Sequence, residues 1–313
     1  MATICSCNTG LGNLGVPNCY ATFKVAKQVI FVEYFNGTGG INGIDLSALT
    51  GPNGEFSQAD LDALVQNLDP GARWYPTPQI KNVTNERAED LKEDFDDGTS
   101  LFIQKGARVF NGMITKADPT LYGNIEKARC STVGYFIIDK AGNLQGNQTR
   151  PGFLDPVRVE DETISGNLMM PTDAGTVKIG LSFGIDSTMD DADLAMITAD
   201  QITANLLGVG GIVDAFNTNT ATKTTTELSF QLDTSFGGVT SRIPVEDLVL
   251  ADFTFFNVTT ALAVVPATVV ESPTVAGFYT ATYAAQTASD VMRVTSATLD
   301  KNYEIVQFEE ALA

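Results

Sequence analysis

Histidine is absent from this chain: none of its 313 residues carries an imidazole. Imidazole has an unperturbed pKa near neutrality and is the commonest general base in enzymes. Its absence excludes the Ser-His-Asp and Cys-His nucleophile pairs and every zinc site that needs a histidine ligand. We therefore expect a protein that is not an enzyme, with no catalytic residue and no cofactor.

Cysteine is also scarce, with four residues, Cys5, Cys7, Cys19 and Cys130. They are too few and too clustered for a disulfide scaffold. Three of them, Cys5, Cys7 and Cys19, could offer thiolates to a metal ion, but a fourth ligand is missing and the spacing is not that of a C-x-x-C knuckle. We expect free thiols and no metal.

Basic residues are outnumbered, because 19 Lys and Arg stand against 38 Asp and Glu, for a formal net charge of −19. Such a surface repels phosphate, which argues against conventional nucleic-acid binding and suits a surface that DNA passes without sticking. No run approaches the ~18 consecutive apolar residues of a membrane span, and no basic and apolar leader opens the sequence. No membrane partner is expected.

Strand patterns are what the sequence has in abundance. They predict a mainly β (α+β) fold, because β-branched and aromatic residues alternate between turn-rich segments. Single strands are expected over 23–35, 162–170 and 176–185. Two hairpins are expected, one over 100–114 that reverses at Lys105-Gly106 and one over 134–144 that reverses around 139–142, where glycine supplies the positive φ of a tight turn.

Three short helices are predicted. Ser57 and Asp60 form a capping box, and Leu61, Leu64, Val65 and Leu68 then follow at helical spacing. A second helix begins at Pro119 and presents Leu121, Ile125 and Ala128. A third is expected over 189–198, where aspartates crowd the first turn and complement the helix dipole.

The residue pattern changes after Asn217–Thr226, a segment of small and polar residues that is typical of a linker. Short β runs then recur at the spacing of a small immunoglobulin-like (Ig-like) sandwich, although the Cys-Trp-Cys mark of antibody domains is missing because Trp74 is the only tryptophan. We expect two domains, 1–222 and 223–313, and we expect the second to fold independently on the outside of an assembly.

Candidate binding chemistry is sparse. A cluster of aspartates could offer oxygens to Ca²⁺, but it lacks the glycine and distal glutamate of an EF-hand loop, so capping is the preferred interpretation: Asp186, Asp190, Asp191 and Asp193. The acidic runs 86–93 and 94–97 contain paired carboxylates, yet nothing places two of them across a cleft, and a solvated face is preferred. Gly208–Gly211 is interpreted as a turn rather than a phosphate loop.

Four segments after a glycine-rich loop and a capped helix carry a family resemblance: ARWYPTP (72–78), KNVTNER (81–87), FDDGTS (95–100) and YFIIDKAGN (135–143). In this order they resemble structural proteins of tailed phages that infect Bacteroidetes, and within that group tail tube (major tail) proteins. The resemblance covers about residues 1–215. The rest of the chain is similar to Ig-like domains fused to phage tail and capsid proteins.

The resemblance implies a β-sandwich or barrel that forms homo-oligomeric rings, usually hexameric and stacked helically, with inner sheets lining a lumen and long loops or arms reaching neighbouring subunits. The implied partners are further copies of the chain, other tail proteins, and genomic DNA that passes through the lumen during ejection without specific binding. The implied location is the virion tail, after synthesis in the host bacterial cytoplasm.

Within such a tube, residues 100–114 and 162–185 are expected to form the inner sheet, because they are long, mostly uncharged and alternating. The wall is expected to carry more carboxylates than basic groups. Two alternatives remain open: a capsid decoration or head-fibre protein, and, from a different class, a carbohydrate-binding or glycan-hydrolysing surface protein.

Overall fold

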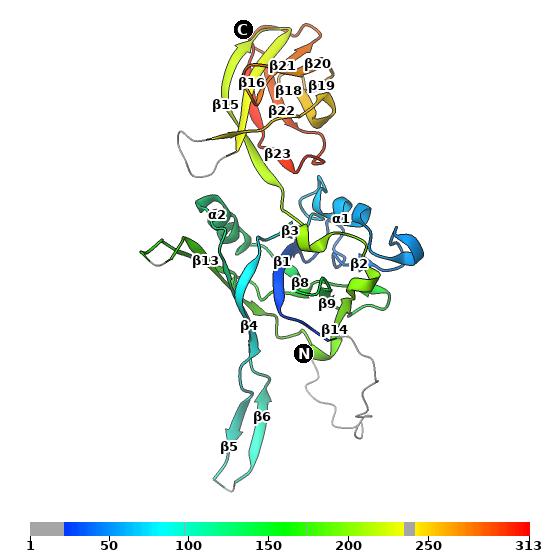
Figure 1. The fold of residues 1–313 in the computed structure, drawn as a ribbon, viewed down its shortest axis with the longest axis vertical. Helices are drawn as coiled ribbons and strands as arrows, with labels where there is room; N and C mark the ends of the chain where they lie inside the picture. Colours follow the sequence, from blue (N-terminus) through cyan, green and yellow to red (C-terminus); the bar gives the residue numbers. More distant parts are fainter. Residues whose placement is uncertain (1–21, 97, 174, 235–241) are drawn as a thin grey trace.

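A computed structural model describes residues 22–96, 98–173, 175–234 and 242–313. The fold is mainly β, as predicted. Three parts follow one another along the longest axis: a two-sheet body, a C-terminal sandwich at one end and a hairpin that projects from the other end of the body (Figure 1). Cys5, Cys7, Cys19 and Asp97 lie outside the described residues.

The body is built on a central antiparallel sheet. Its strands are, in order, β14 (Leu194–Ile197), β9 (Leu144–Asn147), β8 (Val133–Asp139), β1 (Ala26–Glu33) and β3 (Tyr75–Pro76), with β11 (Val157–Arg158) also paired to β8. Every residue of β8 is buried, because this strand is covered on both faces. The predicted strand over 23–35 and the predicted 134–144 hairpin are both confirmed, and Gly142 has the positive φ (89°) that its turn requires.

A second sheet covers one face of the central sheet. Its order is β12 (Ser165–Met169), β13 (Lys178–Ile185), β7 (Arg108–Ile114) and β4 (Ile80–Arg87). Strand β13 alternates strictly between buried and half-buried residues, which confirms the sequence pattern over 176–185. Phe110 and Phe183 stack with ring centroids 4.8 Å apart and contact Tyr135 of the central sheet. The two sheets thus bury one shared core.

Helix α1 (Gln58–Val65) covers the opposite face of the central sheet. The predicted capping box is confirmed: the Ser57 hydroxyl accepts from the Asp60 amide, and the Asp60 carboxylate accepts from the Ser57 amide at 2.8 Å. The expectation that Leu68 continues the buried stripe is wrong. The Trp74 amide donates to the Leu64 carbonyl as the chain folds back, so the helix stops at Val65 and Leu68 lies exposed.

The second predicted helix is confirmed as α2 (Pro119–Ala128), with Asp118 as its N-cap. The third is wrong. The residues after Asp190 form one 3₁₀ turn, η2 (Asp191–Asp193), and then strand β14, because Leu194–Ile197 pair residue by residue with β9 and extend the central sheet. Backbone pairing with an existing strand therefore outweighed the helical pattern.

The remaining short elements of the body connect the sheets. Strand β2 pairs with β10 in a small separate ladder, and single 3₁₀ turns mark bends in the loops: β2 (Ile44–Asp45), β10 (Phe153–Leu154), η1 (Pro52–Gly54), η3 (Ala199–Gln201) and η4 (Leu206–Gly208).

The predicted 100–114 hairpin is wrong in its pairing. Strand β6 (Ser100–Gln104) pairs with β5 (Leu91–Asp94), whereas β7 pairs with β4 and β13. The chain runs along β4 into the projecting hairpin, out along β5, back along β6 and then into β7. Only 108–114 of this predicted inner-sheet segment therefore lies in the sheet that contains β12 and β13, and 100–104 lies in the projecting hairpin.

The C-terminal part is a β-sandwich. One sheet has the order β20 (Pro266–Glu271), β21 (Phe278–Tyr283), β16 (Glu227–Thr234), β15 (Val213–Lys223) and β23 (Tyr303–Ile305), with β17 (Ile243–Pro244) also on β16. The facing sheet is β19 (Leu262–Val264), β18 (Phe253–Asn257), β22 (Val291–Ser296) and β24 (Phe308–Ala311), and η5 (Leu250–Asp252) leads into β18. Phe230 is fully buried between them.

The predicted linker is wrong. Residues 217–223 belong to β15, the longest strand of the described chain, which pairs with β16 and, in parallel, with β23. Much of this strand is exposed or half-buried, so it can carry the polar side chains of threonine and asparagine. Threonine is also a good strand former. A cut between 222 and 223 would pass through the end of this strand. The division into two independently folding domains stays a prediction.

Candidate assembly site

The hairpin formed by β5 and β6 is the least buried part of the described chain. We call residues 89–106 the arm. All nine residues of β5 and β6 are exposed, and no described residue of the arm belongs to any of the three hydrophobic cores. Its strands would reach about 25 Å from the body, at ~3.3 Å per residue.

The arm carries large apolar side chains into solvent: Leu91, Phe95, Leu101, Phe102 and Ile103, which are 37–57% exposed. A two-stranded hairpin without a packed face is at best marginally stable in water. Clustered exposed apolar residues are typical of interaction surfaces. At ~25 cal/mol per Å², covering each of these side chains would contribute about 1 kcal/mol. The arm is therefore a candidate contact with another molecule.

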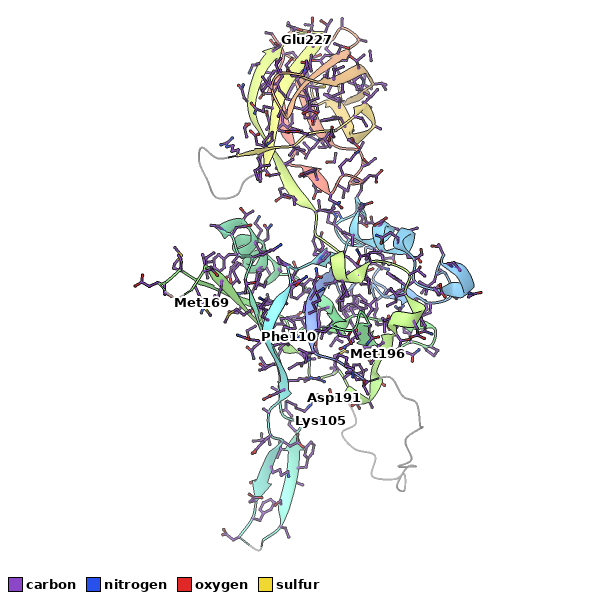
Figure 2. The ribbon with its side chains drawn as sticks, in the orientation of Figure 1. Lys105, Phe110, Met169, Asp191, Met196 and Glu227 are labelled. Atoms are coloured by element: carbon purple, nitrogen blue, oxygen red, sulfur yellow. The ribbon has the colours of Figure 1, made fainter. Side chains whose placement is uncertain are left out.

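The root of the arm is held by a cluster of charges. Asp191 lies between two arginines, with Arg87 Nε at 3.0 Å and Arg108 Nη1 at 2.6 Å from its two oxygens. The hydrogen bond from Arg87 is the main reason that the pKa of Asp191 is lowered. Lys105 reaches Asp190 at 3.3 Å, and Figure 2 shows Lys105 and Asp191 where the arm meets the body.

Backbone contacts also fix the root. The Gly106 amide donates to Asp90 at 3.0 Å, and its carbonyl accepts from Arg87 at 2.7 Å. A Cβ at position 106 would lie 1.9 Å from the Ala88 carbonyl oxygen, so only glycine fits. The Ala88 amide donates to the Ala107 carbonyl at 2.8 Å, which closes the β4–β7 ladder just below the arm.

A groove of about 690 Å³ lies at the other end of the body, where β15 leaves for the sandwich. Its apolar lining includes Leu121, Leu207, Val209 and Val213, and Leu207 and Val213 are 39% and 41% exposed. Two lysines, Lys81 and Lys116, stand at its surface and have no ion-pair partner among the described residues. The arm and this groove therefore lie at opposite ends of the body.

One wall of the groove is fixed by an ion pair between body and sandwich. Arg73, whose side chain is 4% exposed, donates through Nη1 and Nη2 to the two carboxylate oxygens of Glu304 on β23, at 2.5 and 3.1 Å. Asp214, on β15 in the groove lining, has a raised pKa, first because it is half-buried and then because Glu304 is close. The junction is thus tied by charge rather than by a shared apolar core.

The second sheet of the body offers a further contact. Within the described chain, its outer strands β4 and β12 are each hydrogen-bonded on one side only. Met169, on β12, and Met170 beside it are 38% and 71% exposed. Unpaired strand edges of this kind are templates for pairing with another chain.

The acidic positions identified in the sequence serve as caps and counter-ions. Asp186 accepts from the Thr188 amide and Asp190 from the Ala192 amide, while Asp191 binds the two arginines at the root of the arm. Asp94 accepts from Ser100 within the arm. The structure thus brings Asp190 and Asp191 to the arm, which sequence reasoning missed, although Arg87, Lys105 and Arg108 were visible as the basic residues flanking it.

Other candidates are not assembled into a binding site. Gly208 ends the 3₁₀ turn η4, and Gly208–Gly211 line the groove, consistent with a turn. Among the described residues, no three Cys, Asp or Glu side chains are grouped to hold a metal ion. In the same part of the chain, no helix is long and apolar enough to cross a membrane.

Comparisons with known proteins give no family for this chain: no family model matches it, and no curated protein sequence does. The arm, the groove and the open sheet edges are therefore the features that point to a function.

Proposed function

We propose that this protein is a structural subunit that polymerises with copies of itself, and that the polymer is the tail tube of a phage, built from stacked rings around a DNA conduit. The observation that carries the proposal is the arm. It is a rigidly rooted hairpin that exposes five large apolar side chains, and it packs on none of the hydrophobic cores of the described residues.

Two further features support self-assembly. The open edges β4 and β12 can join the four-stranded sheets of neighbouring copies, and closing such edges in a ring removes them from solvent. The net charge of −19 keeps free subunits apart in solution and would repel the phosphates of DNA that passes through a lumen. Neither feature needs a cofactor or a catalytic group.

The sandwich fits the outer side of such a tube. It is tied to the body at one end through Arg73 and Glu304, and it closes its own core with two sheets. A module with its own core and one polar attachment leaves the body sheets free for contacts between subunits.

The test is removal of the arm. Replacing residues 89–106 by Asn-Gly joins Ala88 to Ala107, whose backbones already bond, and keeps the β4–β7 ladder through a two-residue turn. Wild-type protein should form rings or tubes in negative-stain electron microscopy and sediment as a large species. The variant should sediment as a monomer with an unchanged unfolding temperature, because the arm belongs to none of the three cores found among the described residues.

The outcomes separate the candidates. A wild-type chain that stays monomeric at all concentrations contradicts polymerisation. Closed oligomers without an open lumen would instead indicate a capsid decoration or head-fibre protein. Binding to a glycan array by the monomer would indicate the carbohydrate-binding alternative.

A further inference from the structure

We infer that the arm of one copy docks its apolar side chains in the groove of the next copy, so that copies join head to tail. This inference rests on the proposed self-assembly and names the surface that receives the arm. Three observations carry it: position, apolar character and charge.

Position comes first. The arm projects from one end of the body, and the groove lies at the other end, beside α2 and the start of β15 (Figure 1). A contact between two different surfaces of the same molecule is heterologous, and it propagates rather than closing in a pair. Repetition of this contact therefore joins the arm of each copy to the groove of the next.

Apolar character matches on the two sides. Glu93 lies opposite Leu101 in the arm, and Lys92 lies opposite Phe102, so that alternation places Leu101 and Phe102 on opposite faces of the hairpin. The groove presents the exposed side chains of Leu207 and Val213 with the half-buried Val209 behind them. Burial of one of these arm faces there would cover apolar surface that is exposed on both partners among the described residues.

Charge favours the same pairing. The arm beyond its root carries Glu93, Asp94 and Asp96 against one cation, Lys92, and all four residues are exposed. The groove carries Lys81 and Lys116, both exposed. Its two carboxylates have contacts within the chain: Asp118 accepts from the Leu121 amide as a helix cap, and Asp214 is half-buried beside Glu304 and Arg73. The acidic arm thus meets a groove whose two exposed lysines have no ion-pair partner among the described residues.

The arm root and the groove wall are both pre-formed, so that docking does not have to order them. Arg87, Arg108 and Asp191 fix the direction of the arm, and Arg73 with Glu304 fixes β15. Pre-organised surfaces lose less conformational entropy on binding.

A charge swap tests the inference. Lys81→Glu with Lys116→Glu should raise the concentration needed for assembly by about 2- to 10-fold at low salt, since exposed ion pairs contribute modestly. Glu93→Lys with Asp96→Lys should do the same. Combining all four substitutions should restore assembly, and the differences should shrink at 1 M salt, where the Debye length is about 3 Å. Lys140→Glu, an exposed charge change on the β8–β9 turn, is the matched control.

A cross-link locates the contact directly. In a background with all four cysteines changed to serine, a chain carrying Leu101→Cys is mixed with a chain carrying Val209→Cys and treated with a short bismaleimide. A cross-linked dimer is expected from this mixture, and none from the mixture of Leu101→Cys with Thr268→Cys on the sandwich.

Failure of this inference is distinct from failure of self-assembly. If wild type assembles and loss of the arm prevents it, but the groove substitutions change nothing, the arm binds elsewhere and the inference is overturned. Cross-linking of Leu101→Cys to itself would show that arms pair with each other, which also overturns it. If wild type never assembles, the proposed function fails first.

Discussion

The arm and the C-terminal sandwich are both antiparallel β structure, yet they differ in where their apolar side chains lie. In the sandwich, Phe230 contacts Phe253, Phe255, Tyr279 and Phe308 and is fully buried. In the arm, Phe102 sits on a strand whose residues are all exposed.

The difference lies in the number of layers. The sandwich packs one sheet on another, so each apolar face is covered inside the chain, whereas the arm is a single two-stranded layer. The arm therefore leaves its apolar side chains available to another molecule, whereas the sandwich covers its own.

A charge in the body core should unfold the sheet from which the arm projects. Leu181→Asp places a carboxylate at a side chain that is 1% exposed between the two body sheets, and no basic partner is available in that core. We expect loss of the folded body, measured by circular dichroism and thermal unfolding. Asn167→Asp, an exposed position of neighbouring β12, should leave the unfolding temperature unchanged. A stable Leu181→Asp protein would contradict the described core.

Truncation of a phenylalanine to alanine should lower the free energy of unfolding strongly in the sandwich and hardly at all in the arm. Phe230→Ala should destabilise the sandwich by about 3–5 kcal/mol, the usual cost of removing a buried phenylalanine. Phe102→Ala in the arm should change monomer stability by less than about 0.5 kcal/mol, as exposed positions do. Denaturant unfolding of both variants as monomers measures the contrast. Equal losses would mean that the arm packs against its own chain.

Removal of the Arg73–Glu304 ion pair should loosen the junction between body and sandwich without affecting the arm. Glu304→Gln removes the carboxylate that accepts from Arg73, at a cost of about 1–3 kcal/mol for charged hydrogen bonds. Limited proteolysis over 207–212 should become faster. Glu309→Gln removes an exposed pair with Arg293 and serves as the matched control, with little effect expected. Unchanged proteolysis of Glu304→Gln would show that the ion pair does not hold the junction.

The smallest expected effect concerns pH. Because burial and the nearby Glu304 raise the pKa of Asp214 above its usual 3.8, ionised Asp214 disfavours the folded junction at neutral pH. Asp214→Asn should therefore raise the unfolding temperature at pH 7, and the gain should disappear below pH 3.8, where the carboxyl is protonated in both states. A gain that persists at low pH would point to packing rather than charge.

Several features of the fold follow from the sequence alone. Ser57 and Asp60 cap α1, Asp118 with Pro119 begins α2, and Gly142 turns β8 into β9, because caps and tight turns depend on residues a few positions apart. The alternation in β13 fixed which of its side chains face the core, since strand periodicity is local as well. The mainly β class follows from the same local patterns.

Three of the failed expectations concern strand pairing. Asn217–Thr226 consists of small and polar residues and was predicted as a linker, but its first part belongs to β15, which lies between β16 and β23. Residues 194–197 were predicted as helix but are a strand because β9 offers an edge. Residues 100–104 pair with β5 rather than with 108–114, because β4 and β13 already occupy both sides of β7.

Local sequence thus accounts for the class of the fold, the helix starts, the tight β8–β9 turn and the excess of negative charge. The three-dimensional structure was needed to show that Asp190 and Asp191 neutralise the root of the arm and that the arm exposes its apolar side chains. The physical reason is that these ion pairs join residues about 80–100 positions apart, as Arg108 and Arg87 join Asp191, and no local pattern encodes such a pairing.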